Sequence, residues 1–178
     1  MSEIVIRVAE PGDAEAIAEC HTATWKTAYR GLLPDAMLDE MQTADRIPRW
    51  RRTLADPQSG VYVALSDSTV VGFVALIPCR DAGAGNAGEL DAIYILESFA
   101  GQGIGGRFVA IADEWMRDNG FERSVLWVLP TNDPARRFYE RYGWQADGAA
   151  KELNTPRGPV PAVRYVKDLM RAQSAAGS

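Results

Sequence analysis

Residues 95–107 have the sequence ILESFAGQGIGGR, in which four glycines fall within six positions directly after an apolar run. Glycine allows backbone N–H groups to approach a phosphate closely, and a helix that begins after the turn adds the positive end of its dipole. Apolar residues then recur at helical spacing, at Phe108, Ile111, Ala112, Trp115 and Met116. The stretch therefore predicts a strand, a glycine turn and a helix, with the turn suited to a phosphate-bearing cofactor.

The rest of the chain predicts a similar mixture of strands and helices. Apolar runs predict strands over residues 3–8, 61–65, 70–77, 89–96, 124–129, 144–153 and 160–169. Amphipathic spacing predicts a helix that Asp13 caps and Gly31 ends, and a second segment from Pro34. A short helix is expected further on, with Asp133 as its N-cap and Pro134 as its first residue. Residues 81–88 and 154–159 predict loops, because they are rich in turn residues.

The hexapeptide GQGIGG, residues 101–106, satisfies the GxGxxG of a dinucleotide-binding turn and the GxG that begins an acyl-CoA pyrophosphate loop. A dinucleotide fold needs an acidic residue at the end of the next strand and further strand–helix units. Here the next strand ends WVLP at residues 127–130, and only a short helix and a hairpin follow. The Walker pattern fails as well, because no Gly-Lys-Ser/Thr is present. Glycines that serve only a tight strand-to-helix turn remain an alternative for this motif alone.

A second motif follows at residues 128–144, VLPTNDPARRFYERYGW. Together with residues 90–106 it resembles the GNAT superfamily of N-acetyltransferases. The family's loop Q/R-x-x-G-x-G/A corresponds to AGQGIG at 100–105, and its N-x-x-A-x-x-F/L-Y-x-x-x-G-F/W corresponds to residues 132–144. The stretch WKTAYRGLLP at 25–34 is similar to bacterial members. One position departs from the pattern, because Ala100 stands where the family usually has Gln or Arg.

The resemblance covers about residues 3–169 and implies the GNAT fold within the α/β (α+β) class. This fold is a mixed, mostly antiparallel sheet of about seven strands, flanked by about four helices. Its central parallel pair, here 89–96 and 124–129, is splayed apart. We expect one domain over residues 1–170 and a frayed tail over 171–178.

The resemblance also implies which residues hold acetyl-CoA as a co-substrate. The backbone of Ile93, Tyr94 and Ile95 would pair with the pantetheine arm as an added strand does. Asn132 would hydrogen-bond the pantetheine or pyrophosphate, although Asn before Asp-Pro is also ordinary turn chemistry. The pyrophosphate would be held by the loop and the start of the following helix: Gly101, Gln102, Gly103, Ile104, Gly105, Gly106 and Arg107.

Two side chains are the candidate catalytic groups. Glu89 begins the central strand, where family members often carry a carboxylate that accepts the amine proton. Asp91 has the same strand parity and is the alternate base, and water can also take the proton. Tyr139 matches the family tyrosine that protonates the departing thiolate. Without the surrounding motif, Tyr139 would be taken for a core residue of an amphipathic helix.

The sequence gives fewer indications of where the amine substrate, the acetyl acceptor, binds. Trp25, Tyr29 and Arg30 lie where the family's first helices form the acceptor rim, and packing is the alternative for Trp25. His21 is the only histidine and has no metal-spaced partner, so a structural role is expected. The basic run at 49–52 is most simply a solvated helix face.

Composition restricts the partners of the chain. With 19 basic and 24 acidic residues its net charge is -5, which argues against a nucleic-acid or anionic-membrane binder. No signal peptide or membrane-spanning run is found, and Cys20 and Cys79 do not have zinc-ligand spacing. We expect a cytoplasmic protein without a metal.

The sequence therefore predicts an N-acetyltransferase that moves an acetyl group from acetyl-CoA to a small-molecule or peptide amine in a ternary complex. A non-catalytic acyl-CoA-binding regulatory module and, third, a nucleotide-binding oxidoreductase are the alternatives. The resemblance makes a homodimer one assembly to consider, although no residue requires one.

Overall fold

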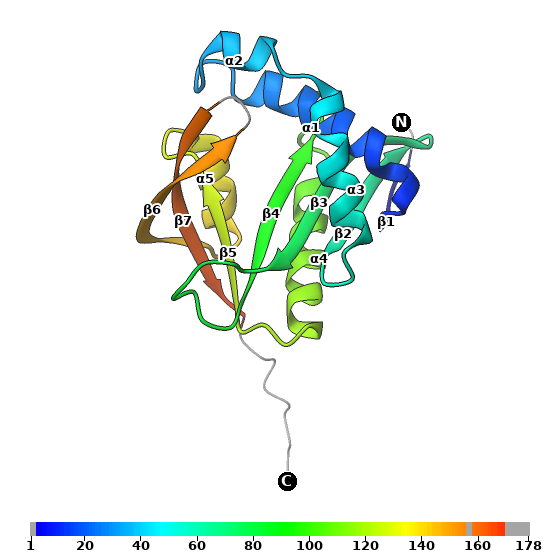
Figure 1. Cartoon of the computed structure of the whole chain (residues 1–178). Coiled ribbons are helices and arrows are strands. Elements are labelled where there is room, and N and C mark those ends of the chain that lie inside the picture. Colours follow the sequence, from blue (N-terminus) through cyan, green and yellow to red (C-terminus); the bar gives the residue numbers. More distant parts are fainter. Residues whose placement is uncertain (1–2, 156–157, 170–178) are drawn as a thin grey trace.

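A computed structural model describes residues 3–155 and 158–169 of the chain. Its centre is a seven-stranded sheet with the order β1-β2-β3-β4-β5-β7-β6 (Figure 1). Neighbouring strands are antiparallel except β4 and β5, which are parallel. The strands are β1 Ile4–Val8, β2 Gly60–Ser66, β3 Thr69–Pro78, β4 Ala87–Ile95, β5 Arg123–Val128, β6 Gln145–Thr155 and β7 Gly158–Asp168.

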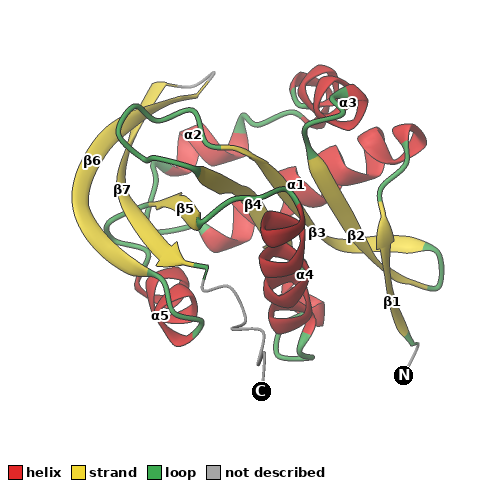
Figure 2. Ribbon diagram, turned by 90° about the horizontal axis from the view of Figure 1, so that it is seen from below, coloured by secondary structure: helices red, strands yellow, loops and turns green. Residues whose placement is uncertain are grey.

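Helices cover both faces of this sheet, as the view in Figure 2 shows. One face carries α1 (Ala14–Ala28) and α3 (Ile47–Ala55), with the short α2 (Asp35–Asp39) beside them. The other face carries α4 (Ile104–Asp118) and α5 (Asp133–Arg141). Three single 3-10 turns complete the described helices: η1 Pro11–Asp13, η2 Thr43–Asp45 and η3 Glu97–Phe99. The sheet separates two apolar cores, because each face must bury its side chains against a helix layer.

The larger core lies under α4 and includes Phe108, Met116 and Trp144. The second core lies under α1 and α3 and includes Ile17, Trp50 and Phe73. β3 is buried along almost its whole length, because both of its faces are covered by helices. The central strands are therefore held rigidly from both sides, and this rigidity positions the site described below.

The expected fold class is confirmed, and each predicted strand is present with its ends shifted by at most a few residues. Five α-helices are found instead of about four, because the segment that begins after Pro34 ends as a helix at Asp39, and a separate helix, α3, begins at Ile47 with Pro48 in its first turn. Two further expectations fall on undescribed residues. These are the tail at 171–178 and residues 156–157 of the predicted 154–159 loop; the described residues of that loop belong to strands, because β6 runs to Thr155 and β7 begins at Gly158.

The caps of two helices differ from the prediction. Asp13 does precede α1, but its carboxylate accepts hydrogen bonds from Arg7 and from the backbone N–H of Glu10 rather than from the helix. The N-cap of α5 is Asn132, not Asp133, and its side-chain oxygen accepts from the N–H of Ala135 at 3.3 Å. Asp and Asn side chains both accept hydrogen bonds from nearby backbone N–H groups, so the sequence alone does not show which neighbouring N–H each of them binds.

No helix among the described residues combines the length and apolar character needed to cross a bilayer.

Candidate active site

The site lies where the two parallel strands separate. β4 and β5 pair only from Ala87 to Glu89 on one strand and from Arg123 to Val125 on the other. Beyond that point each strand continues without the other, and the ribbons diverge in Figure 1. The backbone edge of β4 from residue 90 onward therefore faces an opening instead of a neighbouring strand.

A bulge adds to this separation. In the β3–β4 register Ala75 lies opposite Ala92 and Leu76 lies opposite Leu90, which leaves Asp91 as an extra residue on β4. A bulge bends its strand and increases the local twist. It also changes the parity that the sequence predicted, because Asp91 is the inserted residue.

Two cavities open on the two sides of this gap and share the middle of β4. The first, here called the inner cavity, has a volume of about 270 Å³ and is lined by residues of α1, the η2–α3 segment, β4, β5 and the β6–β7 hairpin. The second, here called the groove, measures about 590 Å³ and lies between β4, β5 and α5. Six residues line both: Tyr29, Leu90, Asp91, Ala92, Tyr94 and Trp127. A ligand in the groove can thus meet a second ligand in the inner cavity across β4.

Glu89 lies at the last paired position of β4 and lines the inner cavity. Its carboxylate makes no hydrogen bond or ion pair with any described residue. Burial, together with the nearby negative charges of Asp91 and Asp81, raises its pKa from 4.5 to about 7. A carboxylate that titrates near neutral pH can accept a proton efficiently.

Asp91 lines the same cavity but has a partner. A guanidinium nitrogen of Arg49 donates to its carboxylate at 2.7 Å. The ion pair neutralises Asp91 within the cavity and uses part of its acceptor capacity. Of the two carboxylates that the sequence proposed, Glu89 is the one without a partner in the described chain.

Tyr139 lies on α5 and lines the groove. Its ring packs against Trp144 and Phe138, and its hydroxyl group has no hydrogen-bond partner among the described residues. Burial and the proximity of Tyr94 raise the pKa of the phenol well above 10. The phenol therefore stays protonated and remains a hydrogen-bond donor toward the groove.

The glycine turn presents a row of free donors. Gly101 and Gly103 have φ values of +74° and +80°, which other residues adopt only under strain. The backbone N–H groups of residues 101–106 have no acceptor within the described chain, whereas that of Arg107 donates to Gly103. Six consecutive free N–H groups at the start of α4 are an arrangement suited to an anion.

Gly105 and Gly106 have a different structural role. A Cβ atom on Gly105 would lie 3.0 Å from the ring of Phe138, and one on Gly106 would lie 2.6 Å from the hydroxyl of Tyr142. Both aromatic residues belong to the α5 segment, so these glycines allow α5 to pack against the start of α4. The turn and the α5 motif are thus one structural unit.

The other predicted cofactor residues are distributed along the groove. Ile93, Tyr94, Ile95 and Asn132 line it. The side-chain oxygen of Asn132 caps α5, as described above, and its amide nitrogen makes no hydrogen bond with a described residue. Arg107 differs, because its guanidinium donates to the carbonyl of Ile4 at 2.9 Å and so lies toward β1.

The three predicted acceptor residues are placed unequally. Trp25 and Tyr29 line the inner cavity, where the Tyr29 hydroxyl lies 3.4 Å from that of Tyr94. Arg30 reaches only the groove, and its guanidinium is paired with Asp35 and Asp39 of α2. The structure thus brings two of the three to the inner cavity.

His21 is buried and also lines the inner cavity. The indole N–H of Trp50 donates to its Nδ1 at 3.2 Å, and its ring stacks on Tyr94. Burial and the positive charges of Arg46 and Arg49 hold the pKa of His21 well below its usual value. The imidazole is therefore neutral and held in place.

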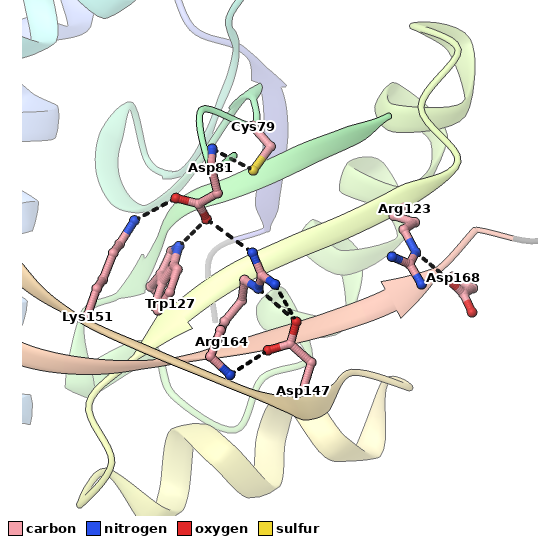
Figure 3. A network of polar contacts seen from close by, with 9 residues as sticks. Cys79, Asp81, Arg123, Trp127, Asp147, Lys151, Arg164 and Asp168 are labelled. Carbon is pink, nitrogen blue, oxygen red and sulfur yellow. Dashed lines mark hydrogen bonds and ion pairs between the residues drawn. The ribbon is translucent and has the colours of Figure 1, made fainter. Parts of the chain in front are cut away.

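A polar network supports the inner cavity from the β6–β7 side (Figure 3). The carboxylate of Asp81 accepts from the indole N–H of Trp127 at 2.7 Å and from Lys151 at 2.9 Å. Arg164 joins the network through Asp147. The carboxylate of Glu89 and the thiol of Cys79 lie within 4.8 Å of Asp81. Since Asp81 already binds a lysine, the three do not form a free set of metal ligands.

Several lining residues escaped the sequence analysis. The basic run at 49–52 is not simply solvated, because Arg49 pairs with Asp91, Arg51 pairs with Glu15 and Trp50 is fully buried. Arg46 and Trp127 also line the inner cavity. No motif marks these residues, since they come from separate elements that only the fold brings together.

Comparisons with known proteins agree with this geometry. A model of the acetyltransferase (GNAT) family matches residues 17–144. The uncharacterized N-acetyltransferase YuaI of Bacillus subtilis is 33% identical over 141 residues, which is 78% of this chain and 79% of that protein. The L-amino acid N-acetyltransferase AaaT of Escherichia coli is 28% identical, covering 93% of this chain and 98% of AaaT. Among solved structures, the PaiA N-acetyltransferase of Thermoplasma acidophilum in complex with coenzyme A superposes with a TM-score of 0.72 at 20% identity, covering 93% of this chain and 99% of that one.

Proposed function

This chain belongs to the acetyltransferase (GNAT) family, and from that premise we propose that it transfers the acetyl group of acetyl-CoA to a primary amine by direct attack in a ternary complex. The observation that carries the proposal is the pair of cavities that meet at β4, with Glu89 on one side and Tyr139 on the other. Direct transfer requires two ligands that meet at one point, and these cavities share six lining residues.

The groove suits acetyl-CoA. The glycine turn does not line the groove, but Gly105 lies close to Ile95, which does. The six free N–H groups of residues 101–106 match a pyrophosphate, which accepts several hydrogen bonds at once. At Ile93, Tyr94 and Ile95, β4 pairs with β3 on one edge and has no partner strand on the other, so the free edge offers main-chain partners to an extended pantetheine arm. Ala100 contributes no side-chain donor, so the backbone of the turn carries this role.

The chemistry follows from the two side chains. Glu89 takes a proton from the amine, directly or through water, and the amine nitrogen forms a bond to the thioester carbon. A backbone N–H of the free β4 edge stabilises the charge that develops on the carbonyl oxygen. The carbon–sulfur bond then breaks, and the Tyr139 hydroxyl gives its proton to the departing thiolate. The phenolate regains a proton from solvent and Glu89 releases one to solvent, which restores both groups.

The test is thiol release from acetyl-CoA with a panel of primary amines: amino acids, polyamines, aminoglycosides and short peptides. We expect amine-dependent CoA release together with acetyl-CoA binding in isothermal titration. Amino acids come first in the panel, because the relative AaaT is an L-amino acid N-acetyltransferase. Binding of acetyl-CoA without turnover of any amine would favour a regulatory module instead. Failure to bind acetyl-CoA at high micromolar concentration would refute the proposal.

A further inference from the structure

Arg46 is a charged side chain on the wall of the inner cavity that lacks an anionic partner. One guanidinium nitrogen lies 3.2 Å from Nε2 of His21, another donates to the sulfur of Met41 at 3.4 Å, and the group stacks over Trp25. All three neighbours are uncharged. Within the described part of the chain Arg46 forms no ion pair, and its partial burial lowers its pKa.

Two other arginines near this cavity form ion pairs, unlike Arg46. Arg49, three residues further on, pairs with Asp91, and Arg30 pairs with two aspartates. The adjacent Asp45 also lines the cavity and its charge raises the pKa of Arg46, but it is exposed and forms no ion pair with Arg46. A guanidinium has five N–H donors, so most of those on Arg46 remain available to a ligand. A partly buried positive charge without a counter-ion is costly unless a ligand supplies one.

His21 provides an independent sign that an acceptor is missing. A neutral imidazole has one N–H and one acceptor nitrogen. Here Nδ1 faces the N–H of Trp50 and Nε2 faces Arg46, and both of these partners can only donate. Whichever tautomer is present, one donor at this ring therefore faces another N–H. An oxygen anion beside Arg46 would resolve the conflict, because it accepts from both the guanidinium and Nε2–H.

From these contacts we propose that Arg46 and the Nε2 edge of His21 form a carboxylate-binding subsite, so that the amine acceptor is an amino acid. The inference rests on the proposed function, since the amine must lie near Glu89 in the same cavity. Glu89 and Arg46 give this cavity one proton acceptor and one unpaired cation, which suits a molecule with an amine and a carboxylate.

The remaining walls indicate the kind of side chain. Part of the wall is apolar and consists of Met41, Leu129, Leu153 and Val160, whereas Gln42 and Asn154 are polar. A volume of about 270 Å³ suits a small molecule better than a folded protein segment. Leucine, whose side chain can contact this apolar part of the wall, is therefore a suitable amino acid for the test.

The experiment compares each amino acid with its own carboxamide, for example leucine with leucinamide, in the thiol-release assay. The amide keeps the side chain and the amine and lacks only the anionic group. Its amine loses a proton more readily, so intrinsic reactivity favours the amide. We expect kcat/KM for the amino acid to exceed that for the amide by at least about tenfold.

Variants locate the effect. Arg46→Gln should abolish the preference through a higher KM for leucine, with kcat/KM for leucinamide nearly unchanged, and Arg46→Lys should retain part of the preference. Arg52→Gln is the matched control, since Arg52 is exposed on α3 and does not line the cavity. Unchanged acetyl-CoA binding and melting temperature show that each variant is folded. Titration of leucine and leucinamide into CoA-loaded protein measures the subsite without turnover.

The experiment distinguishes a wrong carboxylate subsite from a wrong acetyltransferase function. Equal use of leucinamide and leucine, or an equal loss of both in Arg46→Gln, would overturn the carboxylate subsite and leave the acetyltransferase intact. Arg46-dependent leucine binding without turnover would support the subsite and contradict the catalytic proposal. Absence of any leucine binding would overturn the subsite directly.

Discussion

At the scale of single residues, the environment of Glu89 controls the proposed reaction. The same carboxyl group on an exposed helix would be ionised at pH 7 and a weaker base. Burial at the end of the paired region of β4, next to two other carboxylates, makes its ionised form costly and its proton affinity higher. Position within the fold therefore turns an ordinary glutamate into a candidate base.

Replacement of this carboxylate tests its role. Glu89→Gln keeps the shape but cannot accept a proton, so kcat should fall about a hundredfold at pH 7.5 while acetyl-CoA affinity is unchanged. In the wild type, kcat should rise with pH through about 7. Glu19→Gln, an exposed change on α1, is the control. A variant with wild-type kcat would remove Glu89 from the mechanism and leave Asp91 or water as the base.

The same substitution has a predicted effect on stability. The pKa of Glu89 is raised in the folded state, so its ionisation opposes folding. Below pH 4.5, the pKa of the unfolded chain, Glu89 is neutral in both states and does not destabilise the fold. The free energy of unfolding then falls as pH rises from 4.5 through about 7, the pKa in the folded state. Glu89→Gln should therefore raise the melting temperature at pH 8 but not at pH 4.5. An equal effect at both pH values would contradict the assigned environment.

Tyr139 should act on the leaving group and not on binding. In Tyr139→Phe the ring contacts remain while the hydroxyl is lost, so we expect kcat to fall at least about tenfold with little change in the dissociation constant for acetyl-CoA. Steady-state kinetics and calorimetry separate the two quantities. Tyr142→Phe, on the same helix segment, is the matched control. Equal turnover in wild type and Tyr139→Phe would exclude the proton transfer.

At the scale of elements, the glycines of the turn have two different roles: some allow the backbone conformation of the turn, and others allow α5 to pack against α4. Gly101 needs a positive φ and has open space around it, whereas Gly105 is in contact with Phe138. Gly101→Ala should therefore weaken acetyl-CoA binding about fivefold, since the strain of about 1 kcal/mol falls on the turn. Gly105→Ala should mainly lower the melting temperature and kcat, because it displaces α5 and Tyr139. Calorimetry and thermal unfolding distinguish the two, and identical profiles would contradict the division.

The network between β4, β5 and the β6–β7 hairpin should tune the base. Asp81 raises the pKa of Glu89 and Lys151 lowers it. Asp81→Asn should therefore move the pH midpoint of kcat to lower pH, and Lys151→Met should move it to higher pH, each by roughly half a unit. Lys26→Met on α1 is the control. Shifts in the same direction, or none, would show that the network only supports the fold.

At the scale of the whole molecule, the sheet consists of two parts that meet only through the short β4–β5 pairing. A ligand in the groove would bridge these parts and stabilise the folded chain. Acetyl-CoA at a hundred times its dissociation constant should add about 2.7 kcal/mol and raise the melting temperature by roughly 5–10 °C. NAD at the same concentration should have no such effect. A shift with NAD alone would favour the dinucleotide alternative.

The sequence by itself determined the order and type of the elements. Strand and helix periodicity are local properties, and the glycine turn followed by the 132–144 motif identified the family on residues close to one another in the chain. Glu89, Tyr139 and the loop glycines could be named for the same reason. The additional α-helix and the shifted caps were not predicted, because adjacent residues compete for these positions on nearly equal terms.

Only the tertiary structure decided the character of the site. His21 and Arg46 are 25 positions apart, and Arg49 and Asp91 are 42 apart, so no local pattern joins them. The pKa of Glu89 depends on burial and on charges from other elements, which are properties of three-dimensional packing. Local chemistry therefore specified the motifs of the family, and long-range contacts formed the cavity in which we propose that the acceptor binds.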